Sequence, residues 1–137
     1  MEKMGRHEQR QAALQILFAV TGKIPDDSQL DMAYDMVLDG REYDSFLPQL
    51  INGVIAARPE LDKLIDEHLA NGWQVKRITR VDLVILELAL YEITYLPEQP
   101  YRVAVDEAIE LAKEYAGSED AKFINGVLKN FAPNTLD

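Results

Sequence analysis

The residues of this chain that are best suited to binding a phosphate lie within its first ten positions. Arg6 and Arg10 are four residues apart, so on a helix they share one face. The start of a helix adds exposed backbone amides and the positive end of the helix dipole, and both favour anions. Lys3 and His7 add to this basic start, although two glutamates lie beside them. The spacing predicts a small phosphate-binding surface.

Other kinds of chemistry find little support in the sequence. The chain has no Cys, which excludes disulfides, thiol nucleophiles and Cys-ligated metals. His7 and His68 have no second His or Glu at ligand spacing, and the glycines form no nucleotide-binding motif. The serines lie outside any nucleophile elbow. We therefore expect a protein that is not an enzyme, with no catalytic residue, no metal site, no cofactor and no small-molecule substrate.

Length and charge limit the remaining possibilities. The chain has 137 residues, of which 47% are hydrophobic, and this size favours one domain spanning residues 1–137. No apolar stretch is long enough to cross a bilayer, and the first residues lack a secretory signal, so we expect a cytoplasmic protein. The net charge is −10, and residues 26–44 hold seven acids against one base. Asp31, Asp35 and Asp39 recur every fourth residue, which predicts a solvated helix stripe and not a calcium loop.

Helical periodicity dominates the chain and predicts an all-α fold. The expected helices cover about residues 6–20, 28–38, 43–57, a segment opened by Pro59, 79–95, 102–115 and a last helix capped by Asp120. The helix at 79–95 is apolar almost all round, so it should be central. Asn71-Gly72 is the natural hinge between an N-terminal unit, about 1–71, and a C-terminal unit, about 72–137.

Three positions leave alternatives open on periodicity alone. Phe123 is either a core aromatic or an exposed ring that stacks on an unpaired base, beside Lys122 and Asn125. Phe18 is either core or part of an interface. Asn125-Gly126 is either part of an RNA contact or a site of close helix packing, which Gly126 permits because it has no side chain.

Three segments together carry a family resemblance. They are the first helix (residues 6–15), the central stretch (73–92), and the pair of runs Glu-Ala-Ile-Glu-Leu-Ala-Lys (107–113) and Lys-Phe-Ile-Asn-Gly-Val-Leu (122–128). The chain resembles the NusB transcription antitermination family along essentially its whole length. That resemblance implies a NusB-like bundle of about seven helices in two packed three-helix units, acting in transcription regulation without enzymatic activity.

The resemblance also implies partners and binding residues. Family members bind the boxA element of ribosomal RNA leader transcripts with NusE, a small-subunit ribosomal protein, within an antitermination complex that includes RNA polymerase. No membrane is involved. Carried onto this sequence, the protein-partner surface includes Phe18 and Asp82. The RNA-binding residues are Lys3, Arg6, His7, Arg10, Lys122, Phe123 and Asn125.

The same residues leave a second function open. Glu8 and Gln9 interrupt the basic run of the first helix, and the whole chain is acidic. An acidic helical protein-interaction adaptor, with weak or no intrinsic RNA binding, is therefore the alternative. A more remote one is the RNA-recognition appendage of a ribosomal RNA methyltransferase, but no cofactor-binding domain follows within the sequence.

Overall fold

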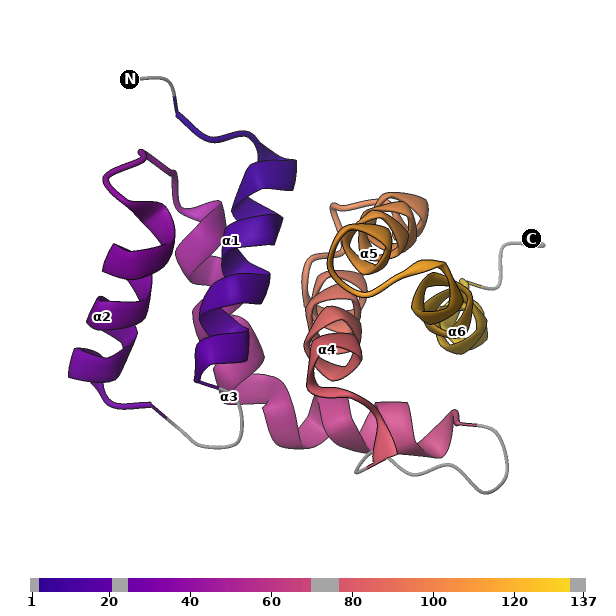
Figure 1. The fold of residues 1–137 in the computed structure, drawn as a ribbon. Coiled ribbons are helices and arrows are strands. Elements are labelled where there is room, and N and C mark those ends of the chain that lie inside the picture. The colour runs from indigo at the N-terminus through magenta and orange to yellow at the C-terminus, as the bar shows by residue number, and fades with distance from the viewer. Residues whose placement is uncertain (1–2, 21–24, 70–76, 134–137) are drawn as a thin grey trace.

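The fold is all-α, as the sequence predicts (Figure 1). A computed structural model describes residues 3–20, 25–69 and 77–133. Within these residues lie six α-helices and one short 3-10 helix. Their bounds are α1 (Arg6–Ala19), α2 (Asp27–Leu38), α3 (Phe46–Glu67), α4 (Arg80–Tyr95), α5 (Tyr101–Tyr115), α6 (Ser118–Leu128) and η2 (Lys129–Phe131). None of the described helices is long and apolar enough to cross a membrane.

The first three helices form one group, in which α1 packs against both α2 and α3 (Figure 1). Asp26 caps α2 by accepting a hydrogen bond from the Gln29 amide at 2.8 Å, and Asp39 ends it in the left-handed conformation, with φ 48°. The segment before α1 is tied to the α2–α3 connection, because the Met4 amide donates to the Glu42 carbonyl at 2.9 Å. This tie places the basic start of the chain next to the beginning of α3.

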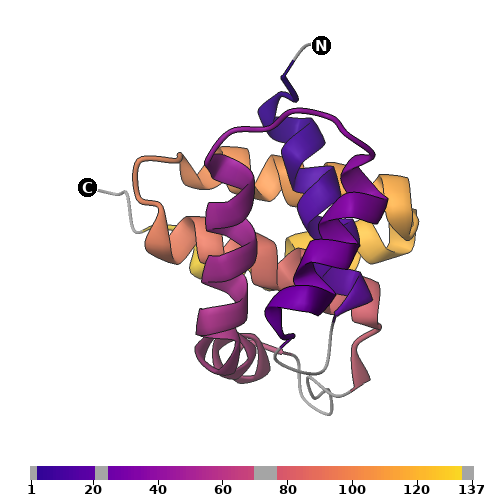
Figure 2. The same cartoon turned by 90° about the vertical axis from the view of Figure 1, so that its left-hand side faces the viewer.

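Helix α3 corrects one sequence prediction. Pro59 was expected to open a separate helix, but it lies inside one continuous helix that runs from Phe46 to Glu67. Pro59 has no amide to donate, which breaks the hydrogen-bond pattern and favours a bend. The two views agree: α3 changes direction part-way, and its second half is seen end-on in Figure 2. Pro48 lies in the first turn of α3, where a proline is tolerated.

The last three helices form a second group around the apolar helix α4. Helix α4 packs on α5 and α6 within the group and on α1 and α3 across the molecule, so it is central as predicted. Helix α6 begins at Ser118 with Gly117, at φ 141°, as its N-cap. The prediction that Asp120 caps this helix is therefore wrong, because Asp120 already lies within its first turn. The predicted hinge at Asn71-Gly72 lies outside the described residues.

Candidate nucleic-acid interface

Arg6 is the exposed cation at the start of α1. Its guanidinium carbon lies 4.1 Å from the centroid of the Phe46 ring, in the first turn of α3. Phe46 is itself buried, so the ring is a fixed platform for the charge. Lys3 is also exposed, and its Nζ lies 3.9 Å from Asp44 Oδ2. A pair so exposed and so long holds its cation weakly, so both side chains can reach a phosphate.

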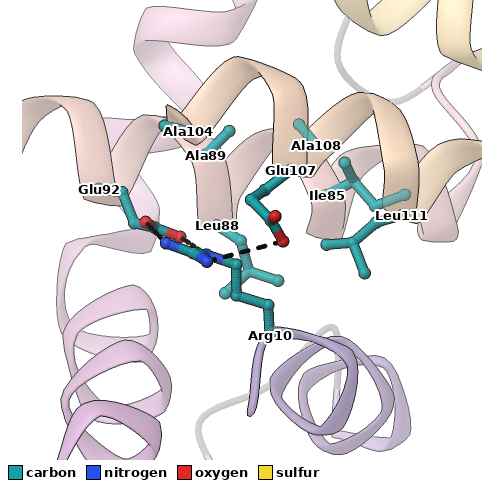
Figure 3. A pocket seen from close by; sticks show the side chains of 9 residues that line it. All are labelled: Arg10, Ile85, Leu88, Ala89, Glu92, Ala104, Glu107, Ala108 and Leu111. Atoms are coloured by element: carbon teal, nitrogen blue, oxygen red, sulfur yellow. Dashed lines mark hydrogen bonds and ion pairs between the residues drawn. The ribbon is translucent and has the colours of Figure 1, made fainter. Parts of the chain in front are cut away.

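Arg10 also lies over the Phe46 ring, with its guanidinium carbon 5.1 Å from the centroid, but it differs from Arg6 in its burial and its ion pairs. Its Nε and Nη2 donate to the two carboxylate oxygens of Glu92 at 2.8 and 2.7 Å, and its Nη1 lies 3.6 Å from Glu107 Oε1. Figure 3 shows the Arg10 side chain between these two carboxylates, among apolar residues of α4 and α5. The Arg10 side chain is only 5% exposed.

The prediction that Arg6 and Arg10 form one exposed face is therefore wrong. Two helical positions four apart share a side of the helix, but Arg10 faces α4, which packs on α1, and its charge meets carboxylates of α4 and α5. The buried Glu92 carboxylate needs a positive partner, and Arg10 provides it. Arg10 is a structural ion-pair residue in this structure and presents no free charge to an RNA.

His7 is held by two carboxylates of α5. Its Nδ1 lies 2.6 Å from Glu107 Oε1, and its Nε2 lies 3.2 Å from Glu114 Oε2. The hydrogen bond with Glu107 is the main reason that the pKa of His7 is raised, and it outweighs the lowering effect of burial. The raised pKa favours the imidazolium, but its charge is largely offset by the two neighbouring acids. His7 thus joins α1 to α5 while remaining half exposed.

The three predicted RNA-binding residues of α6 are exposed or half buried. Lys122 and Asn125 are exposed, and Lys122 Nζ lies 3.4 Å from Glu119 Oε2 in an exposed pair. Phe123 is half buried and packs against the core, so neither alternative left open by the sequence is fully met. The first turn of α6 also carries Asp120, so the positive charge of this region is modest.

The seven predicted RNA-binding residues fall into separate places. We call Lys3, Arg6 and His7 the N-terminal basic cluster, and Lys122, Phe123 and Asn125 the α6 cluster. Helix α5 lies between α1 and α6 in Figure 1. The structure therefore brings the predicted residues to two clusters separated by α5, and not to one continuous patch.

Phe18 borders a shallow apolar groove between α1, α4 and α5. The groove holds about 210 Å³ and is lined by Leu14, Gln15, Phe18, Val81 and Tyr115. The Arg80 guanidinium carbon lies 4.5 Å from the Phe18 ring centroid, and Arg80 Nη2 donates to the Phe18 carbonyl at 2.7 Å. Phe18 is 36% exposed, which answers the question left open by the sequence: it lies at the surface.

Asp82, the other predicted partner residue, is not at the surface. It is 5% exposed, and its Oδ1 has no hydrogen-bond partner among the described residues. Burial, followed by a hydrogen bond with the Asp120 carboxyl, raises the pKa of Asp82 to about 7. The expectation of a solvated or partner-bound Asp82 is thus wrong, because α6 covers it and places a second carboxyl beside it.

Some residues that shape this region were missed by the sequence reasoning. Phe46 gives no signal, because an arginine 40 positions away cannot be paired with it from spacing. Glu92 did carry a signal, since an acid within an apolar helix must find a cation when buried. Arg80 belongs to the acid-free basic stretch around residues 73–81, whose part before Arg77 lies outside the described residues.

Comparison with known proteins places this fold and sequence in one family. The NusB family model matches residues 7–133. The transcription antitermination protein NusB of Levilactobacillus brevis is 42% identical over 137 residues, covering 96% of this chain and 95% of that protein. The NusB protein of Listeria innocua is also 42% identical, covering 95% of this chain and 98% of that protein.

A solved structure agrees with the sequence comparison. T. maritima NusB superimposes with a TM-score of 0.80 at 31% identity, covering 96% of this chain and 92% of that chain. The family-model match runs from the second residue of α1 to just beyond η2 and includes both groups of helices. On this evidence the chain belongs to the NusB family of transcription antitermination proteins.

Proposed function

We propose that this chain binds boxA RNA of ribosomal RNA leader transcripts together with NusE, as a non-enzymatic transcription antitermination factor in the bacterial cytoplasm. The observation that carries the proposal is the 42% identity, along 96% of the chain, to a transcription antitermination protein. A fold relative has been crystallised as antitermination factors NusB and NusE in complex with double-stranded RNA, with a TM-score of 0.78 at 21% identity and 91% of this chain covered. That likeness supports a similar arrangement here.

The geometry limits which residues meet the RNA in this proposal. Lys3 and Arg6 bind phosphates at one end of α1, and Lys122, Phe123 and Asn125 bind at α6. Arg10 and His7 position α1 for RNA binding, because their hydrogen bonds with carboxylates fix α1 against α4 and α5. Few free cations remain, so the affinity of this chain alone is modest and a basic protein partner adds to it.

The groove beside Phe18 is the proposed contact for NusE. An exposed aromatic ring next to an apolar hollow is typical of an anchor in a protein interface. The net charge of −10 favours association with a basic ribosomal protein through electrostatic steering. Asp82 contributes indirectly, by holding α6 against the start of α4.

The decisive measurement is the affinity of the chain with NusE for boxA RNA and for a scrambled RNA. We expect tighter binding to boxA, and equal affinities would remove the claim of specificity. Arg6→Ala should weaken binding and lower the salt slope by about one unit, because one phosphate contact is lost. Lys63→Ala, an exposed lysine of α3, changes the net charge equally and should leave both quantities unchanged.

The acidic adaptor is the second candidate, and one observation favours it. Carboxylates of α4 and α5 already hold Arg10 and His7, so two of the four basic residues predicted in the first ten positions are neutralised within the fold. If the double variant Lys3→Ala, Arg6→Ala retains RNA as the unaltered heterodimer does, the N-terminal basic cluster binds no RNA. If Lys122→Ala retains RNA equally well, the α6 cluster binds none either, and the chain acts through protein contacts.

A further inference from the structure

Two glycines lie within helices of the structure, and the fold explains only one of them. Gly53 is required by packing, because a Cβ there would overlap the Tyr91 ring. Gly126 is exposed, and a Cβ there would meet nothing within 4 Å. Its φ is not among the positive values found at Gly40 and Gly117, so its backbone does not require glycine. The expectation that Gly126 permits close helix packing is thus wrong.

Glycine weakens a helix, since it loses more backbone freedom on folding than other residues. At Gly126 this loss brings no gain in packing or in conformation within the described residues. A residue that is unfavourable for the fold and faces open space is explained by something that comes close to the helix from outside. The neighbouring side chains indicate what that is.

Gly126 lies between two lysines on one face of the helix. Residues 122, 125, 126 and 129 follow the spacing i, i+3, i+4 and i+7, which places them on the same side, and all four are exposed. Lys122 and Lys129 are two turns apart, about 10 Å along the axis. No carboxylate among the described residues forms an ion pair with Lys129. This face presents a cation at each end, with the Asn125 amide and the bare backbone of Gly126 between them.

We propose that Gly126 and Lys129 extend the α6 cluster into a docking face for the sugar-phosphate backbone of single-stranded RNA. The lysines bind phosphates, and Asn125 offers an amide to a ribose hydroxyl or a base edge. The missing side chain at Gly126 lets the strand lie against the helix. Lys129 also leads the strand away from the acidic first turn of α6. This inference rests on the proposed function and adds residues to it.

The first test uses Gly126→Ala and Gly126→Leu, since alanine and leucine are good helix formers. Both variants should raise Tm by roughly 1–4 °C because the helix gains intrinsic stability. Both should weaken RNA binding by the heterodimer with NusE, roughly fivefold for alanine and more for leucine, because the added side chain separates the strand from the helix. Raised Tm with unchanged RNA affinity in both variants would overturn the proposal.

The second test examines charge. Lys129→Ala should lower the salt slope of RNA binding by about one unit, whereas Lys63→Ala should not. Because the contact is with the backbone, the loss of affinity should be equal for boxA and scrambled RNA. This separates the two proposals: equal binding of both RNAs by the unaltered heterodimer contradicts boxA recognition, while unaltered binding by the variants contradicts the docking face. Failure of the unaltered heterodimer to bind either RNA contradicts both.

An amide resonance gives a direct readout. In the heterodimer, adding single-stranded RNA should shift the Gly126 amide signal and leave that of Gly53, which is packed under Tyr91, in place. If NusE instead of RNA shifts the Gly126 signal, and the Gly126 variants lose NusE affinity, the face belongs to a protein partner. That result would overturn the assignment to RNA.

Discussion

Arg10 and Glu92 form a two-point hydrogen-bonded ion pair in the interior, with N–O distances of 2.8 and 2.7 Å. The pair joins α1 to α4 and therefore links the two groups of helices. Both side chains are almost completely buried, at 5% and 3% exposed. Each charge depends on the other, because neither has water to replace its partner.

Removing one member of this pair should destabilise the protein strongly. Arg10→Ala leaves the Glu92 carboxylate buried and unpaired, so we expect the free energy of unfolding to fall by about 3–5 kcal/mol. The double variant Arg10→Met, Glu92→Leu should recover most of that loss, since apolar side chains of similar size replace the pair. Urea denaturation measures both. An Arg10→Ala protein as stable as the unaltered chain would contradict the structural role assigned to Arg10.

The carboxyl pair of Asp82 and Asp120 should make stability depend on pH. Burial and the neighbouring Asp120 carboxyl raise the folded-state pKa of Asp82 to about 7 from its ordinary value of 3.8, so folding favours its protonated form. Its stabilising contribution is complete below about pH 4 and is lost as pH rises through 7. The other titratable groups are the same in the unaltered protein and in Asp82→Asn. Their contributions to the pH dependence of stability therefore cancel when the two proteins are compared.

We therefore expect the Tm of the unaltered protein to decrease more between pH 5 and pH 8 than the Tm of Asp82→Asn. Thermal melts across that range give the result. Asp106→Asn, at an exposed position of α5, serves as the control and should follow the unaltered protein. Parallel Tm profiles for the unaltered protein and Asp82→Asn would show that the pair does not titrate in this range.

The close approach of Gly53 to Tyr91 predicts a steric effect on α3 and α4. Gly53→Ala places a methyl group in the position of the Tyr91 ring, which should cost about 1–3 kcal/mol of stability. Adding Tyr91→Ala should make the Gly53→Ala change much less harmful, because the ring is absent. A double-mutant cycle by denaturant titration measures this coupling. Additive effects would mean that α3 and α4 adjust to the methyl group without the ring moving.

Phe18 should contribute to partner binding more than to folding. Phe18→Ala removes an exposed ring from the groove, so we expect NusE affinity to fall about five- to thirtyfold while stability changes little. Met36→Ala removes a large apolar side chain that is even more exposed, on α2, and should leave NusE binding unchanged. Calorimetry of both variants with NusE distinguishes a specific groove from general surface hydrophobicity. Equal effects would argue against the groove.

Most of the fold follows from local sequence signals. The apolar period of α4 predicts its central place, and the glycine at position 117 and the proline at 100 lie at helix boundaries. Proline suits the first turn of a helix, so Pro59 predicts a helix start. The sequence alone does not distinguish this position from one inside a continuous helix. Helix α3 continues through Pro59 because it packs against both α1 and α4. This packing outweighs the missing hydrogen bond.

The candidate site was harder to predict, because residue type does not reveal whether a charge is free. Arg6 and Arg10 look equivalent in the sequence, yet only Arg10 faces buried carboxylates. Those acids lie 82 and 97 positions further along the chain, so no local pattern connects them to Arg10. The same holds for Asp82, whose neighbour Asp120 comes from another helix. Charge pairing in the interior is decided by the tertiary arrangement.

The bend at Pro59 has a consequence for how the molecule comes apart. Helix α3 begins beside α1 and ends beneath the second group of helices, so both groups pack against the same continuous helix (Figures 1 and 2). Unfolding of either group exposes apolar residues of the other group to water. The chain should consequently lose its structure in a single all-or-none transition, with no half-folded species persisting at the midpoint.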